Sequence, residues 1–399
     1  MNKKVWLIVI LALFILVGGV FWYLRGSFSQ NYKEESVDSG GFFSNLFPDI
    51  GPSADEDNVP PAEDLGKTPT TSPEAANGAL LQLVPESVGG ATFIKNPSTS
   101  PGRVRYVEQA TGHVYDVNPD GTAKTRISNT TVPGVFEVMW APDGNRAIIT
   151  YLTSTGLNIL SAKFTASTTQ GVFLPSDVKE ALFSPKGDRI AYITESPNGG
   201  SVVTASPENK NPRAVFRSPF SSWTLLWPEE GAMYLTTRPS ALLSGFTYRL
   251  GTASGAFEKI AGPRPGLLFG TDGKNALLSE ADSLERTIHS SKIDLKTLAV
   301  TTLDAKLIPE KCAWSKKEKS TVFCALSDPF PQSAMPDGWY QGKLLFTDIA
   351  AKIDLASMSA QKIALGLPID AYKPFLSAEE DMFFFINRYD GSLWALRLK

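Results

Sequence analysis

The chain has 399 residues, of which 42% are hydrophobic and 20% are charged, and its formal net charge is −3. This length exceeds that of a typical single domain and favours internal repeats or several domains. The composition is that of a globular protein with enough apolar residues for a sizeable core. The slightly acidic balance argues against a nucleic-acid-binding protein, because such proteins usually carry a basic excess.

Residues 5–24 form an uncharged apolar run of 20 residues, which is long enough to cross a bilayer as a helix. Lys3 and Lys4 precede this run, and three aromatic residues end it, as is typical at membrane interfaces. We therefore predict that residues 1–25 form a cytoplasmic tip and an uncleaved transmembrane signal anchor, with the rest of the chain extracytoplasmic at the cell membrane. A cleaved signal peptide is the alternative, but its apolar core usually has only about 7–15 residues.

Residues 26–78 are rich in Pro, Ser, Thr, Gly and acidic residues. Between positions 33 and 74 the chain carries ten acidic residues and two lysines. Such a segment buries too little apolar surface to offset the entropy lost on ordering. We predict a disordered acidic linker between the membrane anchor and a folded domain at residues 79–399.

One pattern recurs in this folded part: an apolar strand ends in a large residue, and a tight polar turn and a second apolar strand follow. In six successive copies the large residue is Trp140, Phe183, Trp227, Phe269, Trp314 and Leu376. The intervals between them are 43, 44, 42, 45 and 62 residues. A period near this value with four strands per unit is typical of the blade of a β-propeller.

The turns of the first two copies read WAPDG at residues 140–144 and FSPKG at residues 183–187. Here the chain resembles the WD-repeat-like propellers of the TolB type, which carry a Trp/Phe-Ser-Pro-Asp-Gly turn between the first two strands of a blade. The corresponding turns of the later copies occupy the same position in the repeat but differ in sequence: WPEEG, FGTDG, WSKKE and LSAEE. The resemblance implies a fold and leaves the function open, because this scaffold hosts many unrelated roles.

We predict an all-β fold with seven blades, and six blades are the main alternative. Residues 88–94 are expected to supply the first strand of the first blade. After Leu376 the chain ends one strand short of a full blade. Residues 80–84 are expected to fill that gap, which would close the ring and remove exposed strand edges.

Signatures of enzymes are absent from the sequence: it has no G-x-S-x-G elbow, P-loop, H-E-x-x-H or G-x-G-x-x-G motif. The two histidines, His113 and His289, are expected to be structural or surface residues. Zinc needs at least three protein ligands, and the wide separation of the two His and two Cys in the repeat argues against a zinc site. We therefore expect no enzyme activity, no cofactor and no metal.

Cys312 and Cys324 flank a turn in the fifth of the six copies. Antiparallel pairing centred near Glu318 would place them opposite each other, and an oxidising exterior would favour a disulfide. Two buried free thiols are the alternative.

The longest interval contains an insertion, residues 326–346, between the second and third strands of its blade. By the usual path of a propeller, this loop emerges on the same face as the connections between blades. The residues of that face that we name as a candidate binding site are Trp339, Tyr340, Arg238, Arg264, Arg388 and Tyr389; Arg286 is expected beside them. Long loops on rigid scaffolds often carry function, and Trp, Tyr and Arg are typical interface anchors. In the alternative, Phe330, Trp339 and Tyr340 fold back to cover a blade edge.

The leading hypothesis for function is a membrane-anchored extracytoplasmic scaffold that binds a protein or an envelope glycan, and not nucleic acid. One alternative is a hydrolase or lyase working in the central channel, which would need acids or histidines at the starts of the innermost strands. A structural subunit of a membrane complex is another.

Overall fold

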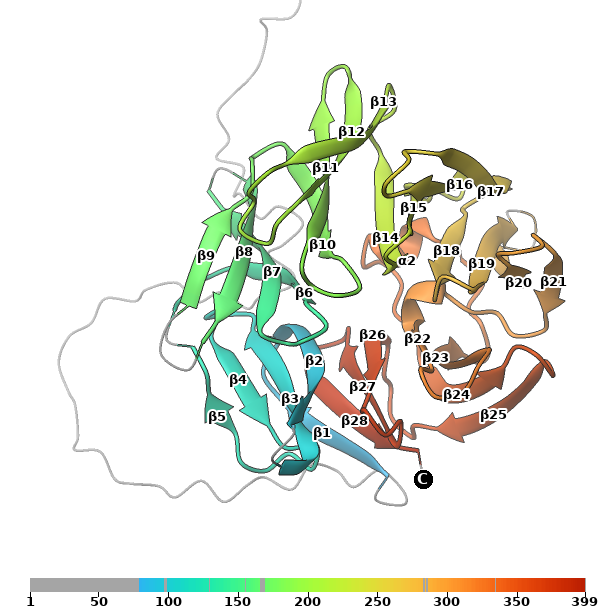
Figure 1. Ribbon diagram of the computed structural model, residues 1–399. Helices are drawn as coiled ribbons and strands as arrows, with labels where there is room; N and C mark the ends of the chain where they lie inside the picture. Colours follow the sequence, from blue (N-terminus) through green and yellow to red (C-terminus); the bar gives the residue numbers. More distant parts are fainter. Residues whose placement is uncertain are drawn as a thin grey trace, which may run out of the picture. The chain divides into compact units, whose positions relative to one another are not determined.

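The computed structural model describes residues 79–398, except 97–98, 129, 155, 166–168, 283, 285 and 334. They form seven four-stranded antiparallel sheets, which are the blades of a ring (Figure 1). The predicted seven-bladed β-propeller is confirmed, and the six-bladed alternative is wrong. The predicted membrane anchor and acidic linker lie outside the described residues. Within the described part, no helix has the length and apolar character needed to cross a membrane.

The strands of each blade are given from the centre of the ring outwards. Blade 1 consists of β2 (Val88–Asn96), β3 (Thr99–Glu108), β4 (Val114–Val117) and β5 (Thr125–Arg126). Blade 2 consists of β6 (Val135–Trp140), β7 (Arg146–Thr153), β8 (Gly156–Phe164) and β9 (Thr169–Phe173). Blade 3 consists of β10 (Val178–Phe183), β11 (Ile190–Ser196), β12 (Gly199–Ala205) and β13 (Arg213–Ser218). Blade 4 consists of β14 (Trp223–Glu229), β15 (Ala232–Thr237), β16 (Ser244–Gly251) and β17 (Phe257–Pro265).

Blade 5 consists of β18 (Leu268–Thr271), β19 (Asn275–Asp282), β20 (Thr287–Asp294) and β21 (Val300–Leu303). Blade 6 consists of β22 (Cys312–Trp314), β23 (Thr321–Ser327), β24 (Asp348–Asp354) and β25 (Ser359–Ala364). Blade 7 consists of β26 (Ala371–Leu376), β27 (Met382–Asn387), β28 (Leu393–Arg397) and β1 (Leu80–Val84). Two short helices, η1 (Pro309–Lys311) and α2 (Asp337–Tyr340), complete the described elements.

The ring is closed by the first strand of the domain, as predicted. β1 pairs with β28, so that Leu80 lies opposite Leu396 and Gln82 opposite Trp394. The outermost strand of blade 7 therefore comes from the beginning of the domain and its other three strands from the end. This pairing joins the two ends of the folded chain and leaves blade 7 as complete as the others.

The hydrophobic core is distributed between the blades. Seven clusters of buried residues each join two neighbouring blades, and an eighth lies against the insertion of blade 6. Between blades 7 and 1, for example, Phe384 and Ile386 pack with Val104 and Tyr106. The strands alternate in side-chain direction, so each sheet contributes one face to the cluster before it and the other to the cluster after it. Each blade is thus stabilised only together with its neighbours.

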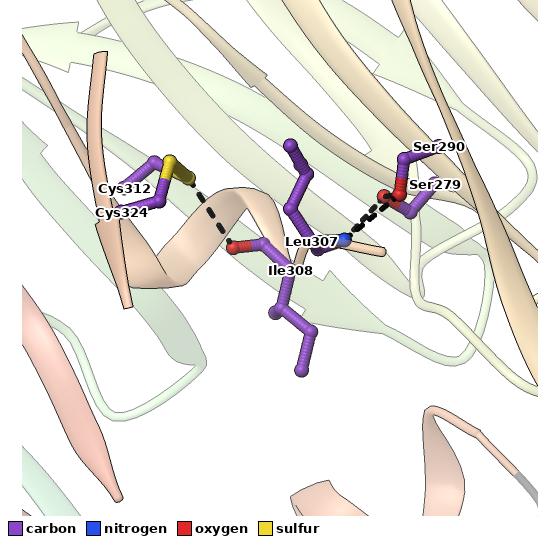
Figure 2. Close-up of a disulfide and its surroundings, with 6 residues drawn as sticks. All are labelled: Ser279, Ser290, Leu307, Ile308, Cys312 and Cys324. Atoms are coloured by element: carbon purple, nitrogen blue, oxygen red, sulfur yellow. Dashed lines mark hydrogen bonds between the residues drawn. A yellow bond between two sulfur atoms is a disulfide. The ribbon is translucent and has the colours of Figure 1, made fainter. Parts of the chain in front are cut away.

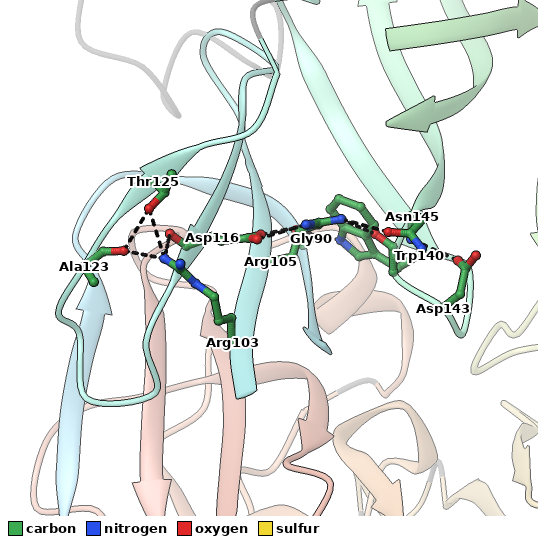
Figure 3. Close-up of polar contacts among 10 residues, drawn as sticks. Gly90, Arg103, Arg105, Asp116, Ala123, Thr125, Trp140, Asp143 and Asn145 are labelled. Atoms are coloured by element: carbon green, nitrogen blue, oxygen red, sulfur yellow. Dashed lines mark hydrogen bonds and ion pairs between the residues drawn. The ribbon is translucent and has the colours of Figure 1, made fainter. Parts of the chain in front are cut away.

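The turn between the first two strands of blade 2 is held against blade 1 (Figure 3). Arg105 of β3 forms a buried ion pair with Asp116 of β4 (2.7 Å), and its Nη1 donates to the carbonyl of Gly144 (3.0 Å). Gly144 has φ of +67°, and a Cβ there would lie 2.9 Å from Ile94. The WAPDG turn therefore needs its glycine both for the backbone conformation and for the close approach.

In two degenerate copies of this turn, a glutamate makes the contact with the preceding blade. Glu230 of the WPEEG turn accepts a hydrogen bond from the backbone N–H of Lys186 (3.2 Å) and pairs with Arg189 (3.3 Å). Glu380 of the LSAEE turn accepts hydrogen bonds from the Ser315 hydroxyl (2.5 Å) and the Lys316 N–H (2.6 Å). The sequence of the turn has changed, but its role in joining adjacent blades remains.

Candidate binding site at the centre of the ring

The two faces of the ring differ in the connections they carry. We call the face with the connections between blades the loop face, and the face with the turns after the innermost strands the turn face. On the loop face, the innermost strands of blades 1 to 3 each begin with a change of register. These β-bulges lie between Val88 and Gly90, between Val135 and Glu137, and between Val178 and Glu180. A bulge redirects the side chains around it, and in blades 2 and 3 it is followed directly by a glutamate.

Charged and aromatic side chains from several blades meet near these strand starts. We call them the central cluster: Glu137, Glu180, Glu310, Tyr340, Tyr372, Lys373 and Arg388. Glu137 of blade 2 forms an ion pair with Lys373 of blade 7, so the contact passes blade 1. The innermost strand of blade 1 carries Gly90 at the equivalent bulge, where a Cβ would lie only 2.4 Å from the carbonyl oxygen of Val138. The absence of a side chain at this position suits a contact between blades 2 and 7.

The insertion of blade 6 brings Tyr340 to this cluster. Its helix α2 is tied to blade 4 by Asp337, which accepts a hydrogen bond from the N–H of Ala241 (2.5 Å). The Tyr340 hydroxyl donates to Glu310 in η1. The neighbouring Trp339, whose ring centroid lies 5.2 Å from that of Tyr340, is only 1% exposed. The guanidinium carbon of Arg388 lies 4.5 Å from the Trp339 ring centroid, and Arg388 Nη2 donates to the Trp339 carbonyl (3.0 Å).

A buried ionic network lies beneath the cluster. Lys311 is adjacent to Glu310, and its Nζ contacts Asp348 (2.6 Å) and Asp370 (2.7 Å). The three side chains are at most 2% exposed. Asp370 also lies 3.8 Å from Nη1 of Arg388. Because Asp348 follows the insertion and Asp370 precedes β26, this network fixes the end of the insertion to the starts of two innermost strands.

A disulfide joins β22 to β23 directly after Lys311 in the chain; Figure 2 shows the bond and its surroundings. Cys312 in β22 is directly opposite Cys324 in β23, and their sulfur atoms are bonded at 2.10 Å. This is the pairing across the hairpin that the sequence suggested. Cys312 directly follows η1, which carries Glu310 and Lys311, so the bond fixes the strand next to this short helix.

The environment changes the acidity of the cluster. Burial raises the pKa of Glu180 to about 7, although the N–H of Leu225 donates to its carboxylate (3.0 Å) and opposes the rise. Burial likewise raises the pKa of Glu310, against the hydrogen bond from Tyr340. The pKa values of Tyr340 and Tyr372 lie well above 10, mainly through burial, so both phenols keep their protons at neutral pH.

The cluster is nevertheless open to solvent. Glu310 is exposed, Tyr340 is 42% exposed, and Glu180 and Tyr372 are half-buried. Surrounding protein therefore shifts the pKa values of these groups while some of their surface stays in contact with water. A ligand arriving from solvent can reach them.

A cavity of about 640 Å³ lies at the opposite ends of the innermost strands. Its lining includes Phe93 of β2, Trp314 of β22 and Pro374 of β26. Pro374 directly follows Lys373, so β26 runs from the central cluster to the cavity. Among the described residues, no group of three or more His, Cys, Asp or Glu side chains is placed to hold a metal ion.

The structure brings together some of the predicted site residues. Trp339, Tyr340 and Arg388 lie in contact, and the charge of Arg238 acts on Glu180. Arg264 lies on the outermost strand of blade 4, where it pairs with Glu280 (2.8 Å). Tyr389 is 46% exposed, and its N–H donates to the side chain of Asn387 (3.3 Å).

The other predicted loop residues have structural contacts. The carbonyl of Arg286 accepts a hydrogen bond from the N–H of Ser333 in the insertion (2.8 Å). Phe330 packs with Phe346 against the buried cluster that contains Trp339. The insertion therefore covers apolar surface with Trp339 and presents Tyr340 to the central cluster, which combines the two alternatives considered for it.

Sequence reasoning missed the carboxylates of the central cluster. Glu137 and Glu180 stand three residues before the large residues Trp140 and Phe183 of the repeat, and Lys373 stands three before Leu376. The repeat frame therefore contained a signal for the central positions. It did not distinguish them from half-exposed strand residues, because a bulge alters the side-chain alternation at this point.

No family model and no curated protein matches this sequence. Similar solved structures are β-propellers. An oligogalacturonate lyase in complex with manganese has a TM-score of 0.57 and 10% identity over 82% of this chain and 95% of its own. YCF48 bound to D1 peptide has a TM-score of 0.52 and 12% identity over 80% and 96%. TolB from Acinetobacter baumannii has a TM-score of 0.44 and 13% identity over 68% and 62%. At these identities the likeness shows the fold alone.

Proposed function

We propose that this protein is a binding module whose central cluster recognises a cationic group, such as a lysine or arginine side chain of a partner protein. One observation carries the proposal: Glu180 and Glu310 have no ion-pair partner among the residues that the structure describes. Tyr372 lies within electrostatic reach of both, and Tyr340 contacts Glu310. Carboxylates attract a cation by charge, and the aromatic rings beside them add cation–π attraction.

The local charge balance supports a cationic ligand. Glu137 is paired with Lys373. In the buried network, the two cations Lys311 and Arg388 balance the two aspartates Asp348 and Asp370. Glu180 and Glu310 remain as two carboxylates outside these ion pairs. Arg238 supplies one further positive charge, which lowers the pKa of Glu180. The excess at the centre is therefore negative. A bound amine would supply the missing positive charge and stabilise both glutamates in their ionised form.

Calorimetric titration tests the proposal with three probes: a peptide carrying lysine, the same peptide with norleucine in its place, and a glucosamine oligomer. Tight binding of the lysine peptide, with about tenfold weaker binding to a Glu180→Gln, Glu310→Gln variant, is the expected result. A preference for the glucosamine oligomer would identify an amino sugar as the source of the amine. Equal binding of the lysine and norleucine peptides would contradict the proposal.

An enzyme working at the centre of the ring is the second candidate. A carboxyl group with a pKa of about 7, as at Glu180, suits general acid–base catalysis at neutral pH. Because an oligogalacturonate lyase is among the similar structures, oligogalacturonate is a suitable test substrate, and the assay measures its cleavage. We expect no turnover, because the excess negative charge at the centre repels a polyanionic sugar. Product formation that disappears in Glu180→Gln would favour the enzyme.

We also propose that the propeller is held outside the cell membrane by residues 5–24. The apolar run and its preceding lysines support this placement, and a disulfide is typical of an oxidising compartment. Extraction of membranes at alkaline pH and protease treatment of intact cells test it. The full chain should stay in the membrane and be digested from outside, whereas a chain without residues 1–25 should not stay in the membrane. Release of the full chain by the alkaline wash would contradict the anchor.

A further inference from the structure

An open aromatic groove lies between blades 3 and 4, and its lining contains none of the seven residues of the central cluster. Its floor is a stack of three rings: Phe257 of β17 lies 4.3 Å from Phe216 of β13 and 4.3 Å from Tyr248 of β16, measured between ring centroids. The stack therefore crosses from one blade to the next. The groove has a volume of about 570 Å³.

Apolar side chains at the groove are left in contact with water. Phe220 is 44% exposed, Leu243 is 67% exposed and Phe257 is 38% exposed, and all three line the groove. Leu242, next to Leu243, is 88% exposed. A contiguous exposed apolar surface of this kind on a folded domain marks an interaction site, whereas single exposed apolar residues are ordinary.

The charges of the groove indicate the chemistry of its occupant. Its two charged lining residues are Arg217 and Arg238, and its lining contains no acidic residue. Neither arginine has an ion pair or a side-chain hydrogen bond within the described part of the chain. Guanidinium groups beside an aromatic surface suit a ligand that carries carboxylates next to an apolar anchor.

We propose that this groove binds an acidic peptide segment of another protein, with an aromatic side chain of the peptide inserted against the ring stack. Carboxylates that flank the aromatic residue pair with Arg217 and Arg238. The rim between Phe220 and Leu243 is open to solvent, which suits an extended segment. This site takes a ligand of opposite charge to that of the central cluster. The groove contains Phe220 and Arg217, which are not part of that cluster, whereas the charge of Arg238 also acts on Glu180. Variants of Phe220 and Arg217 therefore test the groove separately from the proposed function.

Fluorescence anisotropy of labelled peptides tests the groove on the full chain. The first probe is a ten-residue peptide in which Phe and Trp alternate with Asp and Glu. In the second probe Lys replaces the acids, and in the third Ala replaces the aromatic residues. The first peptide should bind, and the other two should bind at least about tenfold more weakly.

Matched variants locate the binding. Phe220→Ala and Arg217→Glu should each weaken the acidic peptide about tenfold, and Arg217→Glu should bind the lysine-bearing peptide more tightly than the unaltered chain does. The controls are Phe173→Ala, an exposed phenylalanine on the outermost strand of blade 2, and Arg213→Glu, an exposed arginine on the same strand as Arg217. Failure of the acidic peptide to bind, or equal losses in the controls and the groove variants, would overturn the proposal.

Discussion

At the scale of single residues, Glu180 combines the properties on which the proposed function depends. It follows a bulge at the start of β10, burial raises its pKa to about 7, and it lacks an ion-pair partner among the described residues. The protein holds this carboxyl in an unfavourable environment for its charge. Such a cost is typical of functional positions, where binding of a ligand of opposite charge relieves it.

The raised pKa of Glu180 makes stability depend on pH. The folded chain binds this proton more tightly than the unfolded chain, whose carboxyl has an ordinary pKa near 4.5. The contribution of Glu180 to stability is therefore complete below about pH 4.5 and is lost as the pH rises through about 7. Glu180→Gln removes this loss, so we expect the variant to gain stability relative to the unaltered chain as the pH rises from 5 to 8.

Urea unfolding at a series of pH values measures this difference. Asp120→Asn is a useful control, because Asp120 has a pKa lowered from 3.8, so its contribution to stability is already complete above the unfolded value. The effect of this substitution should therefore stay constant from pH 5 to pH 8. A stability difference between Glu180→Gln and the unaltered chain that stays constant from pH 5 to pH 8 would show that Glu180 has an ordinary pKa.

At the scale of elements, the insertion of blade 6 is the least repetitive part of the fold. The long interval before Leu376 was enough to predict the insertion from the sequence, and Trp339 and Tyr340 were among the predicted site residues. It did not reveal that the two neighbours have different roles, because their burial depends on contacts with Arg388 and Glu310 from other segments. The same limit applies to Lys311, which becomes buried only because Asp348 and Asp370 reach it from distant positions.

The disulfide between β22 and β23 supports the chain next to η1, the short helix that carries Glu310 and Lys311. The two cysteines are 12 residues apart, and closing a loop of this size stabilises a fold by about 3 kcal/mol in the chain-entropy model. We expect the Cys312→Ser, Cys324→Ser variant to lose about this free energy of unfolding and to bind the lysine peptide more weakly.

Denaturant unfolding with and without a reductant checks this prediction. Reduction of the unaltered chain should reproduce the stability of the double variant, and the double variant itself should not respond to the reductant. If reduction leaves the unfolding midpoint of the unaltered chain unchanged, the bond does not contribute to stability.

At the scale of the whole molecule, the repeat period and the chain ends determined what could be predicted. Seven blades and closure by residues 80–84 followed from the spacing of the large residues and from one strand missing at the end. The residues at the centre did not follow, because they meet only when distant blades close into a ring. Glu137 and Lys373, for example, are 236 positions apart.

Ring closure should make the domain unfold as one unit. Leu83 of β1 is 7% exposed and packs in the cluster between blades 7 and 1. Truncation of a buried leucine costs about 2–5 kcal/mol, so Leu83→Ala should lower the stability of all seven blades by that amount in one transition. Hydrogen exchange across the chain measures this. Faster exchange confined to blade 7 would show that the blades unfold independently.

Proton release on binding is the most direct test of the central claim that Glu180 takes part in recognising a cation. Calorimetry of the lysine peptide at pH 7 in buffers of different ionisation enthalpy measures it. A bound cation should lower the pKa of Glu180 from about 7, so that Glu180 loses about half a proton per molecule on binding. Glu180→Gln should release less than the unaltered chain by this amount. Binding without proton release, or with equal release from the variant, would contradict the account.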